Sequence, residues 1–413
     1  MDVLDPLIYK GVPLDARPTL DGLATCGWNV AHGDTATPVA TLSASALEHN
    51  AAEMARYCAE RGIDLAPHAK TTLAAGLIDL QTRHGAWALT AALPRQAALL
   101  WQQGVNRVLL ANEVTDPAAL RILLEQRDAA GGRDLLVYAD SLRGVELLER
   151  GARDATRPLD VLVEVGYPGG RTGCRTVVAA LEVASAIAAA GSLRLAGVSG
   201  YEGTIAPHRS AAGDAAVDAF LETMRMVAVR LVNGGLVDPA EAVVTAGGSI
   251  FFDRVAAVLR PWCGEQGARL VLRSGCYLIH DHGIYATGTP AANEVPDAPH
   301  FTAALSVWAR VVSRPENGLA LLDAGRRDVS FDSGLPIPLE RWRDGATIEL
   351  GSAAISTLSD QHAFLSWSGE LDVIEGDIVR LGISHPCTTL DRWRLLFVLD
   401  DDHEVVGGVT TVF

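Results

Sequence analysis

Short apolar runs alternate with longer segments of helical periodicity through much of the chain. The apolar runs that predict strands are residues 62–66, 108–111, 134–139, 159–165, 195–199, 242–245 and 268–272. Helical patterns follow at residues 73–78, 117–127, 142–150, 177–190 and 215–233. Repeated strand–helix units of this length imply parallel strand pairing, and closure of about eight units gives a (β/α)8 barrel. We therefore predict an α/β, TIM-type barrel over residues 41–285.

The pattern changes after about residue 290. Residues 302–312 are strand-like, and turn signals such as Glu316-Asn317-Gly318 and Glu375-Gly376-Asp377 separate the later segments. This predicts a C-terminal β-rich domain over residues 286–413. Residues 1–40 lack strand–helix alternation, and we expect them to pack on that β-rich domain.

Length and composition favour a two-domain enzyme-like protein without nucleic-acid or membrane partners. The 413 residues exceed one ordinary core, and hydrophobic residues make up 49%. The net charge of −16 argues against nucleic acid or an anionic membrane as partner, and no apolar run approaches a membrane span. Six cysteines without CxxC spacing, and no basic-then-apolar leader pattern, indicate a reduced, cytoplasmic protein.

Lys70 is the strongest candidate for covalent chemistry. It lies in Pro67-His68-Ala69-Lys70-Thr71, between a predicted strand and a predicted helix, and Lys10 is the only other lysine. The carboxyl ends of strands carry the chemistry of α/β barrels. A lysine kept out of bulk water has a lowered pKa and can form an imine with an aldehyde. The alternative is a solvated surface lysine.

Two glycine-containing loops follow late strands and are candidates for binding phosphate. In Thr245-Ala246-Gly247-Gly248-Ser249, the glycines allow backbone N–H groups to approach an anion, and hydroxyls add donors. The loop Arg273-Ser274-Gly275-Cys276-Tyr277 could add further donors. For each loop, an ordinary tight turn is the alternative, with Tyr277 packed in the core.

Arg171 and Tyr201 are candidates for contacts with a ligand ring. Arg171 lies in a glycine-rich loop after residues 159–165, where a guanidinium could hydrogen-bond a phenolate. Tyr201 follows residues 195–199 and could line the same barrel mouth. A solvated arginine and a tyrosine that only caps the barrel remain open.

The candidate metal ligands are His385 and Cys387. Residues i and i+2 of an extended chain face the same side, so both side chains could reach one cation. An imidazole with a thiolate is typical of zinc and leaves positions open for water or substrate. A lone His-x-Cys also occurs frequently without any metal.

Together these segments resemble the D-threonine aldolase and D-serine dehydratase family, which has the alanine-racemase-like fold of type III pyridoxal phosphate enzymes. The resemblance spans residues 37–393 and keeps the family's order. It rests on Thr37-Pro38-Val39, Pro67 to Thr71, Arg171-Thr172-Gly173, Gly200-Tyr201-Glu202-Gly203, Ala246 to Ser249, Ser359-Asp360-Gln361-His362, Gly376-Asp377 and His385-Pro386-Cys387. The chain departs from the family at Ala66 (usually arginine), Thr72 (often histidine) and Gln361 (often glutamate).

The resemblance implies roles for individual residues. Lys70 would carry pyridoxal 5′-phosphate and act as the catalytic residue. The phosphate would lie against Gly247, Gly248, Ser249, Gly275 and Tyr277, with Thr245 in the same cofactor site. Arg171 would lie near the pyridine O3′ and Tyr201 near the ring. His385 and Cys387 would bind a divalent metal beside the substrate's β-hydroxyl.

The activity implied by the resemblance is elimination from a D-3-hydroxy amino acid, such as D-serine or D-threonine, to a 2-oxo acid and ammonia. Cleavage of Cα–Cβ to glycine and an aldehyde is the first alternative, and racemisation is the second. The family's dehydratases tend to carry cysteine as second ligand, so Cys387 favours dehydratase, with zinc over manganese or magnesium. A barrel-only cofactor carrier would need no β-rich domain, and the family implies a homodimer.

Overall fold

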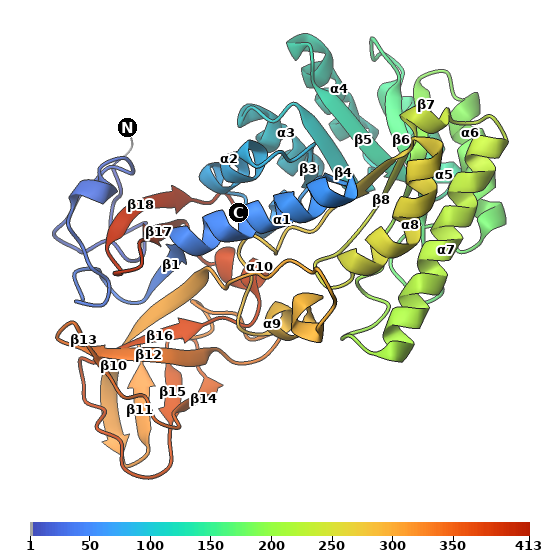
Figure 1. Cartoon of the computed structure of the whole chain (residues 1–413). Helices are drawn as coiled ribbons and strands as arrows, with labels where there is room; N and C mark the ends of the chain where they lie inside the picture. Colours follow the sequence, from blue (N-terminus) through green and yellow to red (C-terminus); the bar gives the residue numbers. More distant parts are fainter. Residues whose placement is uncertain (1–2) are drawn as a thin grey trace.

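The computed structural model describes residues 3–413 and contains a barrel and a second sheet (Figure 1). The barrel sheet has eight parallel strands in the order β2-β9-β8-β7-β6-β5-β4-β3. These strands are β2 (Asp64–Leu65), β3 (Leu89–Ala91), β4 (Arg107–Glu113), β5 (Asp134–Ala139), β6 (Leu159–Val165), β7 (Leu193–Gly200), β8 (Val243–Ala246) and β9 (Arg269–Leu272). The predicted α/β barrel is confirmed.

Backbone hydrogen bonds between the first and last strands of this order close the barrel. Trp87 N donates to Leu65 O at 2.8 Å, and Thr90 N donates to Pro67 O at 2.9 Å. Side chains that alternate along the strands fill the interior, as expected for a barrel of this size. They include Ala66, Ala88, Leu109, Leu136, Tyr138, Leu162, Ala196, Val243 and Val271.

Helices α1 to α8 surround the barrel (Figure 1). They are α1 (Ala44–Arg61), α2 (Ala75–Arg83), α3 (Pro94–Gln102), α4 (Pro117–Ala130), α5 (Leu142–Ala152), α6 (Val177–Ala189), α7 (Ala211–Asn233) and α8 (Phe252–Gln266). Several begin at a side-chain cap: Ser141, Thr176 and Ser210 each accept a hydrogen bond from a backbone N–H three residues on. Four short 3-10 helices are η1 (Leu23–Thr25), η2 (Ala69–Thr71), η3 (Pro239–Glu241) and η4 (Ala291–Asn293).

The second sheet has ten strands, and its main path is β13-β12-β16-β10-β1-β17-β18. Strands β11, β14 and β15 extend from β10. The strands are β1 (Val39–Ser43), β10 (Leu305–Glu316), β11 (Leu319–Leu322), β12 (Ile337–Arg343), β13 (Ala346–Ile348), β14 (Ala354–Leu358), β15 (Ala363–Ser366), β16 (Ile378–Gly382), β17 (Leu395–Leu399) and β18 (Val405–Thr410). The predicted C-terminal β-rich region is confirmed.

The N-terminal segment belongs with the second sheet. Strand β1 pairs antiparallel with β10 and parallel with β17, so residues 41–43 lie in this sheet and not in the barrel. The prediction that the barrel begins at residue 41 was therefore wrong, because β1 belongs to the second sheet and the first barrel strand is β2. Leu4, Val12 and Leu23 pack with Trp308 and Phe397 in a buried cluster on the same sheet.

Two short helices connect the sheets to the barrel mouth. Helix α9 (Ile284–Gly288) follows β9, and α10 (Pro386–Leu390) lies between β16 and β17 in the chain. Both lie between the barrel and the second sheet (Figure 1). None of the helices within residues 3–413 is long and apolar enough to cross a membrane.

Candidate active site

A cavity of about 520 Å³ lies at the carboxyl ends of the barrel strands. Every strand from β2 to β9 contributes to its wall through the loop that follows it or through its last residues, and α9 and α10 complete it. The lining residues used below are His68, Lys70, Thr71, Glu164, Arg171, Tyr201, Gly247, Gly248, Ser249, Arg273, Gly275, Cys276, Tyr285, His385 and Cys387. The volume is in the range of small-molecule sites, and the position is that of barrel active sites.

Lys70 reaches this cavity from the short helix η2, directly after β2. Its side chain is exposed to the cavity, whereas the neighbouring Ala69 and Thr71 are buried. The backbone anchors the segment, because His68 N donates to Arg273 O at 3.2 Å. The amine is therefore held at a strand end and remains accessible to a ligand, as the sequence predicted.

The glycine loop after β8 lines the cavity through Gly247, Gly248 and Ser249. The carboxylate of buried Glu202 occupies two of its donors: Gly247 N lies 3.0 Å and Gly248 N 2.5 Å from Glu202 oxygens. The sequence analysis quoted Glu202 only as part of a motif and missed this contact. An anion in the cavity must therefore use other donors, or displace this carboxylate.

Further donors are available beside that loop. Within residues 3–413, the N–H groups of Ser249, Gly275 and Cys276 have no protein acceptor. Gly275 also needs to be glycine, because a Cβ there would lie 2.5 Å from His68 O. Unpaired N–H groups in a glycine-lined corner form a typical cradle for an anion.

Thr245 lies beneath the cavity and does not line it. Its hydroxyl donates to Val271 O at 2.9 Å and accepts from Arg273 Nη1 at 2.8 Å. Arg273 Nη2 donates to Gly200 O at 2.6 Å, so this buried guanidinium ties three strand ends together. Thr245 is therefore a support for Arg273, and its hydroxyl proton is already donated to Val271 O.

The side chain of Tyr277 also lies outside the cavity, which corrects the prediction that it faces a phosphate. Its ring packs 5.8 Å from that of Phe301, and its hydroxyl lies 3.4 Å from Gln81 Nε2. The chain turns directly after Gly275, so Cys276 faces the cavity and Tyr277 faces the core. The alternative of a packed tyrosine is the correct one.

Arg171 and Tyr201 meet at the cavity wall, as the sequence suggested. The Arg171 guanidinium carbon lies 4.4 Å from the centre of the Tyr201 ring, a cation–π contact. Burial raises the pKa of Tyr201 to about 12, with the charge of Glu202 as the next cause. The phenol is therefore neutral at pH 7 and can donate or accept a hydrogen bond.

His385 and Cys387 enter the same cavity from the second sheet, but not by the predicted geometry. Pro386 begins helix α10 with His385 at its N-cap, so Cys387 lies in a helical turn and not in extended chain. Proline at the first helical position is typical of a helix start. The expectation that extended-chain alternation brings the two side chains together was therefore wrong, although both line the cavity.

A carboxylate fixes the orientation of the His385 ring. His385 Nδ1 lies 2.6 Å from Asp332 Oδ2, and Thr388 Oγ1 donates to Asp332 Oδ1 at 2.8 Å. The charge-assisted contacts lower the pKa of Asp332 against the opposing effect of burial. With Nδ1 engaged, Nε2 is the nitrogen left for a ligand. No local pattern pointed to Asp332, which lies 53 positions before His385.

Cys387 lies against a second thiol that the sequence analysis did not assign. Its Sγ is 3.5 Å from Cys276 Sγ and 3.5 Å from Thr71 Oγ1. Hydrogen bonding between the sulfurs lowers the pKa of Cys276 and raises that of Cys387. Within residues 3–413 no three His, Cys, Asp or Glu side chains form a ready-made metal cluster.

A pair of neighbouring carboxyl groups, Glu113 and Glu164, was also missed. Burial, and then the hydrogen bond and charge of Glu164, raise the pKa of Glu113 to about 9. Glu113 therefore holds its proton at pH 7 beside Glu164, which lines the cavity. The two residues come from β4 and β6, which flank β5, so their meeting depends on how these three strands pair.

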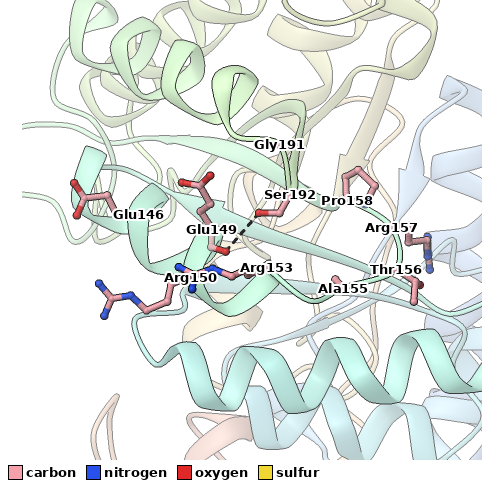
Figure 2. Close-up of a pocket in the computed structure, with 10 residues that line it drawn as sticks. All are labelled: Glu146, Glu149, Arg150, Arg153, Ala155, Thr156, Arg157, Pro158, Gly191 and Ser192. Atoms are coloured by element: carbon pink, nitrogen blue, oxygen red, sulfur yellow. Dashed lines mark hydrogen bonds between the residues drawn. The ribbon is translucent and has the colours of Figure 1, made fainter.

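A second hollow, of about 730 Å³, lies at the opposite end of the barrel (Figure 2). It is formed by the end of α5, the loop to β6 and the turn before β7, with Ser192 Oγ 3.4 Å from Glu149 O. Loops at the amino ends of barrel strands serve stability, while chemistry is found at the carboxyl ends. We therefore assign the active site to the smaller cavity at Lys70.

Comparison with known proteins gives two matching family profiles. The profile described as "Alanine racemase, N-terminal domain" matches residues 42–253, about half the chain. The profile described as "Putative serine dehydratase domain" matches residues 304–399. The two matches fall on the barrel and on the second sheet, and the second includes both candidate metal ligands.

Curated relatives and solved structures agree with these profiles. The chain is 28% identical to 3-hydroxy-D-aspartate aldolase of Paracoccus denitrificans (strain Pd 1222) over 305 residues, which cover 73% of this chain and 74% of the relative. It is 26% identical to the solved D-threonine aldolase from Filomicrobium marinum, with TM-score 0.77, covering 93% of this chain and 96% of that one. D-threo-3-hydroxyaspartate dehydratase from Delftia sp. HT23 shares the fold, at 22% identity and TM-score 0.72, with 91% and 97% covered.

Proposed function

We propose, since this chain belongs to the D-threonine aldolase and D-serine dehydratase family with its alanine-racemase-like fold, that it is a pyridoxal 5′-phosphate- and metal-dependent lyase. Its substrate is a D-3-hydroxy amino acid such as D-serine or D-threonine, and its products are a 2-oxo acid and ammonia. One observation carries this proposal: Lys70 from the barrel and the His385–Cys387 pair from the second sheet face one cavity.

The cavity residues fit pyridoxal phosphate. Lys70 offers an accessible amine, and the unpaired N–H groups of Ser249, Gly275 and Cys276 offer donors to a phosphate. Arg171 and Tyr201 offer a cation and a neutral phenol to the ring and its oxygen. When bound, the cofactor supplies an electron sink for the charge that develops at the substrate Cα.

Lys70 has two functions in this proposal. Its Nζ would hold the cofactor, and its amine would remove the proton from the substrate Cα. Its place on a short helix between two buried residues limits its range of motion. Tyr201, Tyr285 and Ile284 give the same cavity an aromatic and apolar wall.

His385 and Cys387 fit a divalent metal as an imidazole–thiolate pair. Asp332 holds His385 Nδ1, so Nε2 is the ligand atom, and a thiolate favours zinc over manganese or magnesium. Two protein ligands leave positions for water and substrate. When bound, the metal supplies a Lewis acid for the substrate's β-hydroxyl.

Two observations support elimination as the outcome. The thiolate ligand Cys387 is the residue that the family's dehydratases tend to carry, and the profile over residues 304–399 is that of a serine dehydratase domain. Elimination needs the β-hydroxyl to leave, and a metal held by His385 and Cys387 would supply the Lewis acid for that departure.

Cleavage of Cα–Cβ is the second candidate, and a different observation favours it. The curated relatives at 25–28% identity are named aldolases, acting on 3-hydroxy-D-aspartate and D-threonine. Cleavage would require the β-hydroxyl to lose its proton to a base, so one site could serve either reaction. The product, and not the fold, distinguishes them.

The deciding experiment incubates the purified protein, loaded with pyridoxal phosphate and zinc, with D-serine and D-threonine. We expect 2-oxo acid and ammonia in stoichiometric amounts, with little glycine. Predominant glycine and aldehyde would establish the second candidate, formation of the L-isomer would establish a racemase, and no turnover of either substrate would overturn the proposal.

Metal removal provides the second arm of this experiment. Chelation should abolish turnover without removing the bound cofactor, as should His385→Ala and Cys387→Ala. Cys387→Asp should retain metal and shift the product ratio toward glycine, because a harder oxygen ligand replaces the thiolate. Undiminished elimination by exhaustively demetallated protein would contradict the metal's role.

The oligomeric state is part of the proposal. Symmetric dimers are the commonest oligomers, and in this fold type the second sheet of one subunit completes the barrel mouth of its partner. Light scattering at micromolar concentration should therefore give twice the chain mass. A fully active monomer would count against it.

A further inference from the structure

Two thiols from distant parts of the chain meet in the active-site cavity. Cys276 follows barrel strand β9, and Cys387 lies in α10 between strands of the second sheet. Their Sγ atoms are 3.5 Å apart, and Thr71 Oγ1 lies 3.6 Å from the first and 3.5 Å from the second. No other thiol pair in contact occurs within residues 3–413.

We propose that Cys276 and Cys387 form an oxidation site, at which a peroxide closes a disulfide across the cavity. The sulfurs must approach from 3.5 Å to about 2.05 Å, the length of a disulfide bond. Because the two thiols already contact each other, no backbone segment has to be displaced from between them.

The chemistry balances with hydrogen peroxide as the oxidant. One thiolate attacks a peroxide oxygen, the O–O bond breaks, and a sulfenic acid and hydroxide form. The second thiol then attacks the sulfenic sulfur, the S–O bond breaks, and water leaves as the S–S bond forms. Overall, two thiols and one hydrogen peroxide give one disulfide and two waters, and two electrons pass from sulfur to oxygen.

The other four cysteines lack these conditions. Cys58, Cys174 and Cys263 are buried and have no second thiol in contact, so none of them can close a disulfide. Cys26 is partly exposed but has no thiol neighbour, so it cannot resolve a sulfenic acid to a disulfide. Cys387 is partly exposed and lines the cavity, where a small peroxide can enter.

The disulfide has consequences for the site that rest on the proposed function. It removes the thiolate from the His385–Cys387 metal pair, and a single imidazole does not retain zinc at low metal concentration. It also links α10 to the loop after β9 within the cavity that contains Lys70. Oxidation should therefore release metal and stop turnover, and bound zinc should protect the thiols.

The test uses the full-length protein loaded with pyridoxal phosphate, with and without zinc, treated with hydrogen peroxide. Intact mass should fall by two hydrogen atoms, and non-reducing peptide mapping should join the peptides that contain Cys276 and Cys387. Turnover should fall about tenfold or more and return with dithiothreitol. In zinc-loaded protein, disulfide formation should be slower than in zinc-free protein. Zinc release, measured with a pyridylazo dye, should accompany disulfide formation.

Matched variants isolate the pair. Cys276→Ser and Cys276→Ala should form no cross-link, and Cys26→Ser should form it as the unmodified protein does. Circular dichroism and the melting temperature establish that each variant is folded. If either folded Cys276 variant still loses two hydrogen atoms, or if the unmodified protein yields unlinked Cys276 and Cys387 peptides, the oxidation site is refuted.

Failure of this inference is distinguishable from failure of the proposed function. Peptide mapping reports the cross-link whether or not the protein acts on D-3-hydroxy amino acids. A cross-link that forms while turnover and zinc content stay unchanged would overturn the proposed effect on the site.

Discussion

The two walls of the active-site cavity are held in place by different means. On the barrel wall, Lys70 and Gly275 are fixed by backbone, through strand ends and hydrogen bonds between neighbouring loops. On the wall formed by the second sheet, His385 and Cys387 are held by side-chain partners, Asp332 and Cys276. The barrel wall is therefore a property of the local fold, whereas the other wall depends on long-range contacts.

This difference teaches that cofactor binding and metal binding are separable in this protein. Substitutions on the barrel wall should remove the cofactor and leave the metal ligands intact. Substitutions around His385 should lower the affinity for the metal and leave the cofactor bound. A substitution on one wall that removed the ligand of the other wall would break this comparison.

Lys70→Ala should have the largest effect. Turnover should fall about 10³-fold or more, because the covalent link and the base at Cα are both lost. The cofactor should no longer be fixed to the chain by borohydride, while zinc content stays unchanged. Lys10→Ala is the matched control. Lys10 Nζ lies 2.8 Å from Asp328 Oδ1, and neither residue lines the cavity. A Lys70→Ala protein that borohydride still labels would refute the assignment.

Gly275→Ala should raise the Kd for pyridoxal phosphate about tenfold to a hundredfold. The new methyl group would lie 2.5 Å from His68 O, so the loop that carries the unpaired N–H groups would have to move. Fluorescence titration with pyridoxal phosphate measures it. Gly191→Ala is the control, since nothing lies within 4 Å of a Cβ there. Equal affinities for the two variants would show that Gly275 does not shape the cofactor site.

Asp332→Asn should reduce zinc affinity about 10- to 100-fold without changing cofactor content, because the carboxylate no longer orients His385 through Nδ1. Competition with a chelating dye measures this affinity. Asp360→Asn removes an exposed carboxylate of the same region, paired loosely with Arg327 at 3.5 Å, and should leave it unchanged. Loss of the cofactor from Asp332→Asn would break the separation of the two walls.

Glu113→Gln should change stability rather than chemistry, with a clear dependence on pH. The pKa of Glu113 rises from 4.5 to about 9 on folding, so between these values the folded state holds a proton that the unfolded state has lost. Rising pH therefore destabilises the wild type across this window, whereas the amide variant escapes this loss. The melting temperature of the variant, relative to wild type, should increase steadily between pH 5 and about pH 9.

Thermal unfolding at several pH values checks this expectation. Glu146→Gln, at an exposed glutamate paired with Arg143, is the control and should show no such trend. A difference between Glu113→Gln and wild type that is constant with pH would mean that Glu113 is not protonated in the fold.

The barrel could be predicted from sequence because its signal is local. Apolar runs and helical periodicity identified most strands, and a lysine directly after a strand could be placed at the barrel mouth. Strand β3, with only three residues, was not singled out, because so short a run has no visible periodicity. The glycine loop after β8 was also predicted, but its contact with Glu202 was not, since it joins residues 45 positions apart.

For the wall formed by the second sheet, the sequence predicted which residues take part but not how they are arranged. His385 and Cys387 were selected for their ligand chemistry, yet the extended geometry was wrong because Pro386 starts a helix. Asp332 and Cys276 lie 53 and 111 positions from the residues they contact, so no local sequence pattern links them to His385 and Cys387. The prediction for Tyr277 was wrong for a simpler reason. In a tight turn the side chains of adjacent residues point apart, and the sequence does not show whether Cys276 or Tyr277 faces the ligand.

Strand β1 has a consequence for how the chain can be divided. Leu42 pairs with Leu305 on one side and Val398 on the other, although the barrel follows directly after it. During synthesis this early strand has no partner until β10 emerges, and its second partner, β17, comes later still. A cut between barrel and second sheet would leave β10 and β17 as unprotected edges, which are prone to aggregation. Any engineered exchange of the second sheet must therefore carry the first 43 residues with it.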